Sequence, residues 1–136
     1  MAETLIKQQG MDPTTRLASK TITGTRDLAA ASGDVAYTGV GFRPTSIVVF
    51  AGITAAVPYS SGGAGSGRSG YSMVRAFDGN TYANLYADAV IVIAQATGSK
   101  DQWAKVASYD ADGFTLTWTK VNLPTGSAAL SFLCFR

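Results

Sequence analysis

The stretch with the clearest chemical signature is a run of small residues near the middle of the chain. Residues 65–70 read GSGRSG and fit G-x-G-x-x-G, the glycine pattern of a dinucleotide-binding turn. That chemistry needs a strand directly before the first glycine and a helix that begins at the last one, so that the pyrophosphate lies on the helix N-terminus. Here the preceding apolar run ends near Ile53, and the following YSMVRAF alternates like a strand. We therefore expect residues 54–70 to form an exposed Gly/Ser loop that binds no nucleotide.

Other groups that could carry chemistry are few. The chain has no histidine and one cysteine, which excludes a Ser-His-Asp triad and most zinc sites. Asp110 and Asp112 in DADG resemble the start of a calcium loop, but FTLTWTK follows in place of further acidic ligands. A turn explains these aspartates, and Cys134 in LSFLCF is expected to be a small core residue. We expect no enzymatic activity and no catalytic, cofactor-binding or metal-binding residue.

The charge pattern excludes two further classes of partner. Eleven Lys and Arg residues against nine Asp and Glu give a net charge of +2, and the basic residues are scattered without a cluster. Nucleic-acid binding requires clustered cations. The N-terminus has no signal-peptide pattern, and the longest apolar run, residues 89–94, is far shorter than a membrane span. We expect a protein made in a cytoplasm that binds no nucleic acid and does not insert into a membrane.

The elements that position these groups are predicted to be strands. In FTLTWTK the residues Phe114, Leu116 and Trp118 alternate with threonines, which is typical of a half-buried strand. The preceding DADG is a hairpin turn in which Gly113 can take positive φ. Residues 81–89 are ambiguous between helix and strand. The predicted strands cover residues 34–40, 45–53, 71–77, 88–95, 102–109, 114–120 and 128–136.

Six to eight short strands separated by turns predict an all-β fold, an antiparallel β-sandwich or barrel. Its core is expected to include Ile47, Val49, Val90, Val92, Phe114, Leu116, Trp118, Leu130 and Phe132. Trp103 and Trp118 are expected to be core or subunit-interface residues rather than a platform for a sugar. Residues 1–20 are more polar and contain Gly10 and Pro13, so they predict an N-terminal arm ahead of a domain at 21–136.

Two features predict self-association. Charged residues make up 15% of the chain, against about 25% in a typical domain. The C-terminal AALSFLCFR is apolar on both faces, whereas a two-layer sandwich buries one face of each strand. We expect the second face, with Leu133 and Phe135, to meet another subunit. In the arm, Leu5, Ile6, Arg16 and Leu17 are the candidate contacts to a partner protein.

Two blocks of the sequence carry a family resemblance. ASGDVAYTGVGFRPTSIVVFAGI (31–53) and SYDADGFTLTWTKVNLPTGSAALSFLCFR (108–136) resemble a recurrent class of small bacteriophage virion proteins. The order of features, F-x-P, a buried strand, G-F-x-L-x-W and a last strand with a terminal aromatic residue, is similar to the H-type lectin β-sandwich. That resemblance implies a trimer and a place in a virion, and residues 54–86 lie outside it.

These observations together predict a non-enzymatic phage structural protein located in the virion. The leading interpretation is a homotrimeric capsid decoration or head-fibre protein that its arm anchors to other virion proteins of the capsid or tail. The alternative is a lectin-like receptor-binding module of a tail or tail fibre, which binds a glycan of the host surface. No cofactor is expected in either case.

Overall fold

The chain folds into two antiparallel β-sheets. The computed structural model describes residues 18–53, 59–66, 69–76, 85–95 and 100–136, and within these ranges it contains ten strands and no helix. The strands, in chain order, are β1 (Ser19–Asp27), β2 (Gly33–Thr38), β3 (Ser46–Ile53), β4 (Tyr59–Ser66), β5 (Ser69–Ala76), β6 (Leu85–Ala87), β7 (Ile91–Gln95), β8 (Lys100–Asp110), β9 (Gly113–Val121) and β10 (Ser127–Phe135).

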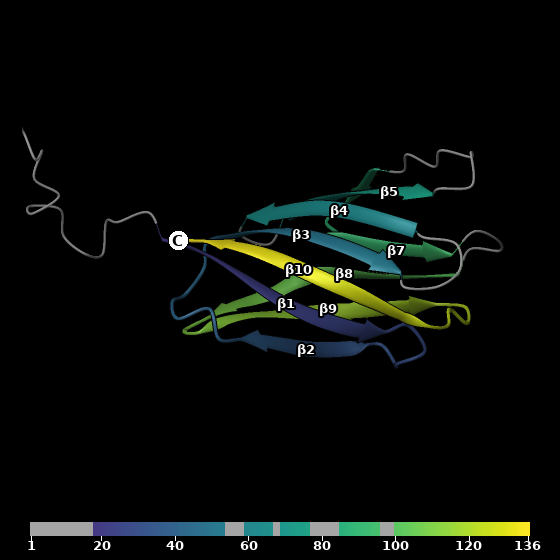
Figure 1. The fold of residues 1–136 in the computed structure, drawn as a ribbon, viewed down its shortest axis with the longest axis horizontal. Helices are drawn as coiled ribbons and strands as arrows, with labels where there is room; N and C mark the ends of the chain where they lie inside the picture. The colour runs from purple at the N-terminus through teal and green to yellow at the C-terminus, as the bar shows by residue number, and fades with distance from the viewer. Residues whose placement is uncertain (1–17, 54–58, 67–68, 77–84, 96–99) are drawn as a thin grey trace, which may run out of the picture.

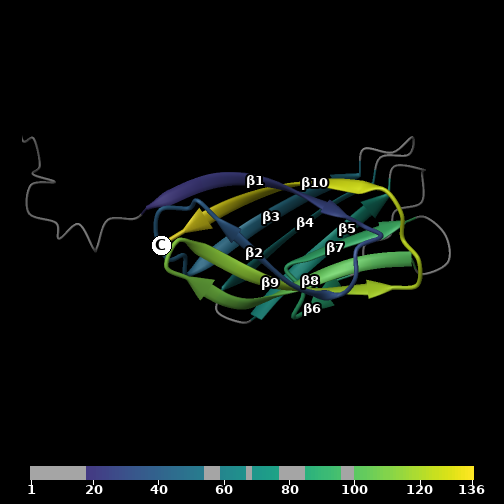
Figure 2. The same cartoon turned by 90° about the horizontal axis from the view of Figure 1, so that it is seen from below.

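The two sheets differ in size and lie face to face. The larger sheet has six strands in the order β1-β10-β3-β4-β5-β6, and the smaller has four in the order β2-β9-β8-β7. Figures 1 and 2 show the two layers from perpendicular directions, with β1 and β10 in one layer and β2 and β9 in the other. Every pairing of neighbouring strands is antiparallel. The predicted antiparallel β-sandwich is therefore confirmed.

Each of the seven predicted strands is present, and three strands were not anticipated. β1 begins at Ser19, so Ser19 and Lys20 belong to the sandwich and not to the arm. The exposed loop predicted over residues 54–70 is wrong over Tyr59–Ser66, which form β4, and at Ser69 and Gly70, which begin β5. Residues 54–58 and 67–68 lie outside the described residues. β6 shows that Leu85–Ala87, within the stretch 81–89 that was ambiguous between helix and strand, form a strand.

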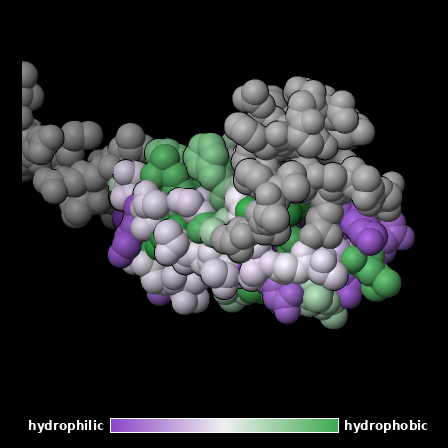
Figure 3. Space-filling model, turned by 45° about the vertical axis from the view of Figure 1, so that its right-hand side comes forward, coloured by the Kyte–Doolittle hydropathy of each residue, from purple (hydrophilic) through white to green (hydrophobic). Residues whose placement is uncertain are grey.

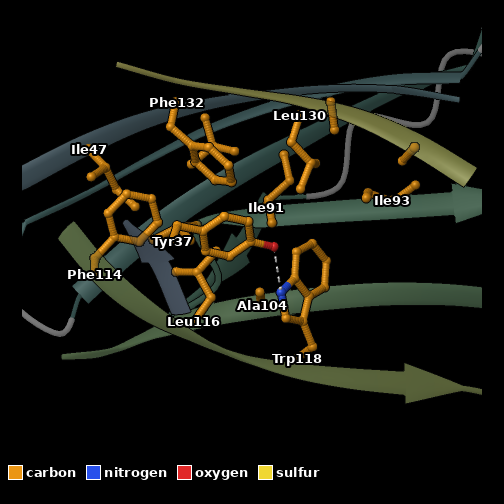
Figure 4. Close-up of a cluster of buried hydrophobic side chains, with 14 of the residues drawn as sticks. Tyr37, Ile47, Ile91, Ile93, Ala104, Phe114, Leu116, Trp118, Leu130 and Phe132 are labelled. Carbon is orange, nitrogen blue, oxygen red and sulfur yellow. Dashed lines mark hydrogen bonds between the residues drawn. The ribbon is translucent and has the colours of Figure 1, made fainter. Parts of the chain in front are cut away.

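The core lies between the sheets and is dominated by aromatic rings. Phe132 of β10 packs edge to face on Phe114 of β9 with ring centroids 5.1 Å apart, and it contacts Tyr37 of β2 at 4.6 Å. Trp118 of β9 donates its Nε1–H to the Tyr37 hydroxyl at 3.2 Å (Figure 4). Burial raises the pKa of the Tyr37 phenol above its usual value, so the hydroxyl stays protonated. All nine predicted core residues and Cys134 are buried, as expected.

One buried polar contact joins the two sheets at the side where β1 and β2 lie. The fully buried side chain of Gln102 on β8 accepts a hydrogen bond from Arg26 Nε of β1 at 2.7 Å. Its Nε2 donates to the carbonyl groups of Leu28 and Ala30, at 2.7 and 2.9 Å. The Arg26 guanidinium lies 4.9 Å from the Trp118 ring, where a cation–π contact stabilises it. The connection between β1 and β2 is thereby fastened to the opposite sheet.

The DADG turn joins β8 to β9 as predicted, but the reason for its glycine is different from the expected one. Gly113 has no positive φ; a Cβ atom built on it would lie 1.9 Å from the carbonyl oxygen of Tyr37. The glycine is required because the backbone of β2 approaches this closely, and no side chain fits there.

We expect Leu116→Ala to lower the free energy of unfolding by about 2–5 kcal/mol, because Leu116 is fully buried between the sheets. Thr119→Ala is the matched control on the outer face of the same strand and should cost less than about 1 kcal/mol. Urea titrations of both variants measure the difference. Equal midpoints for the two variants would contradict the placement of Leu116 in the core.

Candidate interaction surface

The described part of the chain contains no cluster of side chains suited to binding a metal ion. Within it, no three His, Cys, Asp or Glu residues lie close enough together to hold a metal ion. Nor does this part include a helix long and apolar enough to cross a membrane. The candidate arm contacts Leu5, Ile6, Arg16 and Leu17 lie outside the described residues. The surfaces of the two sheets are the remaining candidate sites of interaction in the described residues.

The two predicted interface residues lie on the outer face of the six-stranded sheet. In β10, Ala128, Leu130, Phe132 and Cys134 point into the core, and the residues between them point outward. Leu133 and Phe135 are therefore on the outer face and half-buried. The expectation that β10 is apolar on both faces is confirmed. Whether another subunit covers Leu133 and Phe135 stays a prediction.

The neighbouring strand β3 extends this apolar face. Its inner positions Ile47, Val49, Ala51 and Ile53 are buried, so Val48 and Phe50 point outward. Val48 lies directly opposite Leu133, and Phe50 lies opposite Ser131. Phe50 is 58% exposed, one of two large hydrophobic side chains so exposed in the described chain, and the other is Leu123 in a loop. We call Val48, Phe50, Leu133 and Phe135 the outer apolar patch.

The glycine-rich strand β4 leaves space for the Phe50 ring beside this patch. Gly62 pairs with Phe50 in the β3–β4 register. A Cβ atom at Gly62 would lie 3.4 Å from Cδ1 of Phe50, so the Phe50 ring lies over the glycine. Since Gly62 has no side chain, the ring can lie along the sheet surface instead of standing away from it. Figure 3 shows apolar surface on the upper side of the molecule, next to the atoms drawn in grey.

On its inner face, β4 supplies a backbone carbonyl for a contact between the sheets. Gly65 is buried and pairs with Ile47. The Tyr109 hydroxyl of β8, in the opposite sheet, donates to the Gly65 carbonyl at 3.1 Å. Burial raises the pKa of Tyr109 to about 12, so the phenol remains a hydrogen-bond donor throughout the neutral range.

The GSGRSG motif belongs to a hairpin between two strands. Gly65 and Ser66 end β4, Ser69 and Gly70 begin β5, and the register pairs Gly65 with Gly70 and Ser66 with Ser69. A dinucleotide-binding turn leads into a helix, and strand β5 follows here instead. The motif therefore does not have the geometry of a phosphate cradle.

The outer face around the patch is nearly free of charge. Thr21, Thr23 and Thr25 of β1 line one side of it and are exposed. Among the described outward-facing residues of β1, β10, β3 and β4, only Asp27 at the end of β1 is charged. Interfaces between protein subunits are depleted in charged residues at their centres. This face therefore has the composition of a subunit contact.

The two tryptophans occupy different environments. Trp118 is fully buried in the core between the sheets. Trp103 is half-buried on the other side of the four-stranded sheet, where it pairs with Val92 and packs against the cluster of Ala89 and Val92. Val92 thus lies in a small cluster apart from the main core, although it is buried as predicted.

Electrostatic effects concentrate at the turn between β8 and β9. The Asp112 carboxylate accepts hydrogen bonds from the N–H groups of Gly41 and Gly39, at 2.6 and 3.1 Å. These two bonds lower the pKa of Asp112, because they stabilise its charged form. Hydrogen bonds from Ser108 and Thr115 lower the pKa of Asp110 in the same way. The aspartates of DADG hold the turn, as predicted, and Asp112 also fixes the glycines that lead from β2 toward β3.

Comparisons with protein-family models, with curated proteins and with solved structures find no match for this chain.

We expect Asp112→Asn to flatten the loss of thermal stability in acid. A lowered native pKa gives stability that is present above the unfolded value of about 3.9 and is lost as the pH falls through the native pKa. The variant lacks this charged acceptor, so its melting temperature should be lower near pH 6 and should approach that of the wild type near pH 2. Parallel pH profiles for the two proteins would contradict the role of Asp112.

Proposed function

We propose that this protein is a non-enzymatic structural component of a bacteriophage virion, a capsid decoration or head-fibre protein that assembles with copies of itself. The observation that carries the proposal is the outer apolar patch, where Phe50 is 58% exposed on a nearly uncharged sheet face. A sheet face of this composition packs well on another protein, because apolar area leaves water and few charges lose their hydration.

The geometry of the patch favours contact with a flat partner. The Phe50 ring lies over Gly62, and Val48 and Leu133 lie side by side in the next row of the sheet. A ligand site for a small molecule is usually concave. This surface is instead the face of a β-sheet on which small residues lie beside the Phe50 ring. A sheet face of a second copy is the simplest surface that matches it, and the sequence resemblance implies three copies around a closed axis.

The virion part of the proposal rests on the sequence resemblance and gains support from one contact. The glycines of YTGVGF and the aspartate of DADG belong to the two sequence blocks that carry the resemblance. Gly39 and Gly41 donate directly to Asp112. The two blocks are thus parts of one structural unit. In the proposal, residues 1–17 reach from the start of β1 to a neighbouring virion protein.

We expect Phe50→Ser to weaken the contact between copies of the chain through the outer apolar patch. Burying a Phe side chain contributes about 1.5–3 kcal/mol, so its loss should weaken each contact roughly 10- to 100-fold. Leu123→Ser is the matched control, since Leu123 is 73% exposed but lies in the loop before β10. Light scattering over a dilution series gives the masses.

The wild type and Leu123→Ser should have the same mass, and Phe50→Ser should dissociate at a higher concentration than either. An unchanged mass for Phe50→Ser would contradict the role of the patch. A folded wild type that is a single chain at micromolar concentration would contradict self-association altogether.

The location is tested on particles. Immunogold labelling with an antibody against this chain, on phage particles from the host that carries the gene, should mark the heads. Purified protein lacking residues 1–17 should keep the mass of the full chain and fail to bind particles stripped of it. Label on tails alone would favour the receptor-binding alternative, and absence of the chain from particles would contradict the virion proposal.

A further inference from the structure

Strand β1 forms an open edge of the six-stranded sheet. It pairs with β10 over all nine residues, from Ser19 opposite Phe135 to Asp27 opposite Ser127, without a bulge. No other described strand pairs with β1. The other sheet edges in the described chain are shorter, since β2 has six residues, β7 five and β6 three.

The hydrogen bonds at the two ends of β1 show which backbone groups face the open side. The N–H of Arg136 donates to the carbonyl of Ala18, and the N–H of Leu28 donates to the carbonyl of Gly126. In an antiparallel ladder, hydrogen-bonded pairs alternate with pairs that are not bonded. Lys20, Ile22, Gly24 and Arg26 therefore bond to β10. The N–H and C=O groups of the odd-numbered residues, Thr21, Thr23 and Thr25 at the centre, are directed away from it.

This edge lacks the usual protection against a further strand. Proteins block open edges with charged residues, prolines, bulges or short strands. From Thr21 to Thr25 the sequence is TITGT, with no charge and no proline, and the pairing with β10 is regular. By contrast, the six-residue edge strand β2 carries Asp34. The open edge of β1 is thus long, regular and uncharged at its centre.

We propose that β1 pairs antiparallel with β1 of a second copy about a twofold axis at Ile22. In this register Thr21 lies opposite Thr23 of the partner subunit, and both have outward-directed backbone groups. The two Ile22 side chains, half-buried at the rim of the core, meet across the axis. Lys20 faces a glycine, so no like charges are opposed. Threonine pairs and apolar pairs across strands are both favourable.

The register about Ile22 is favoured over its neighbour. Centring the pairing on Thr23 would place Lys20 opposite Arg26 of the partner subunit, and directly opposed like charges are destabilising. A shift by one residue would place inward-facing side chains opposite outward-facing ones. The twofold contact joins two six-stranded sheets into one continuous sheet. Both outer apolar patches then lie on the same face of the joined sheet. Together with a threefold contact through the patch, it gives an assembly of six chains.

Thr23→Pro tests the edge directly. Proline removes the outward N–H of Thr23 but no bond to β10, and prolines are tolerated on edge strands. Thr23→Val keeps the N–H and is the matched control. By light scattering of the full chain, Thr23→Pro should have half the wild-type mass, three chains in place of six, and Thr23→Val should keep six. A folded Thr23→Pro variant with the wild-type mass would overturn the proposal, as would a wild type of three chains.

A second pair of variants tests the register and avoids proline. In the doubly substituted T21K/T23K variant, lysines oppose lysines across the axis, and the mass should again halve. In the T21E/T23K variant, each acidic side chain faces a basic one, and six chains should persist. Equal masses for the two variants would overturn the register about Ile22.

These outcomes separate the edge contact from the patch contact. Phe50→Ser should leave pairs of chains held by β1, whereas Thr23→Pro should leave sets of three held by the patch. Pairs in the wild type that Thr23→Pro dissolves and Phe50→Ser does not would support the edge and contradict the patch. A wild type of three chains whose mass Thr23→Pro does not change would support the patch contact and contradict the edge contact.

Discussion

Phe132 packs against the stacked rings of Tyr37 and Phe114, and this contact holds the two sheets together. It requires β10, β2 and β9 to present their aromatic residues inward at the same level. Because side chains alternate along a strand, this inward set fixes the outward set as well. Once Phe132 is inside, Leu133 and Phe135 must lie on the outer face. The core and the outer apolar patch are consequences of one register, and neither can change without the other.

The glycines have separate roles that follow from the same geometry. Gly24 of β1 leaves room for Tyr37, whose Cε1 would lie 3.2 Å from a Cβ atom there. Gly62 supports the ring of Phe50 on the outer face. On the inner face, the backbone carbonyl of Gly65 accepts a hydrogen bond from the Tyr109 hydroxyl. The run of small residues in β4 therefore contributes to the packing of the sandwich and leaves space for the Phe50 ring on its outer surface. A phosphate-binding role is not needed to explain it.

A strand can be predicted from the sequence when its own apolar residues mark the face that points inward. β9 was predictable because Phe114, Leu116 and Trp118 alternate with threonines, and β10 and β3 because of their apolar runs. β1 was not predictable, since its inward positions include Gly24, which packs beside Tyr37, and Arg26, which is buried through its bond to Gln102. β4 was missed because glycine and serine usually indicate a loop, and only pairing with β3 and β5 makes them a strand. Leu133 and Phe135 were found from sequence, whereas Val48 and Phe50 required the register.

The central claim is that the outer face of the six-stranded sheet contacts another copy of the chain. Photo-cross-linking from position 50 tests it most directly. One variant carries a benzophenone amino acid in place of Phe50, and the control variant carries it in place of Leu123. The account predicts cross-linked dimers from position 50, mapping to β3 or β10 of the other chain, and far fewer from position 123. Equal yields from the two positions, or cross-links from position 50 only within one chain, would contradict it.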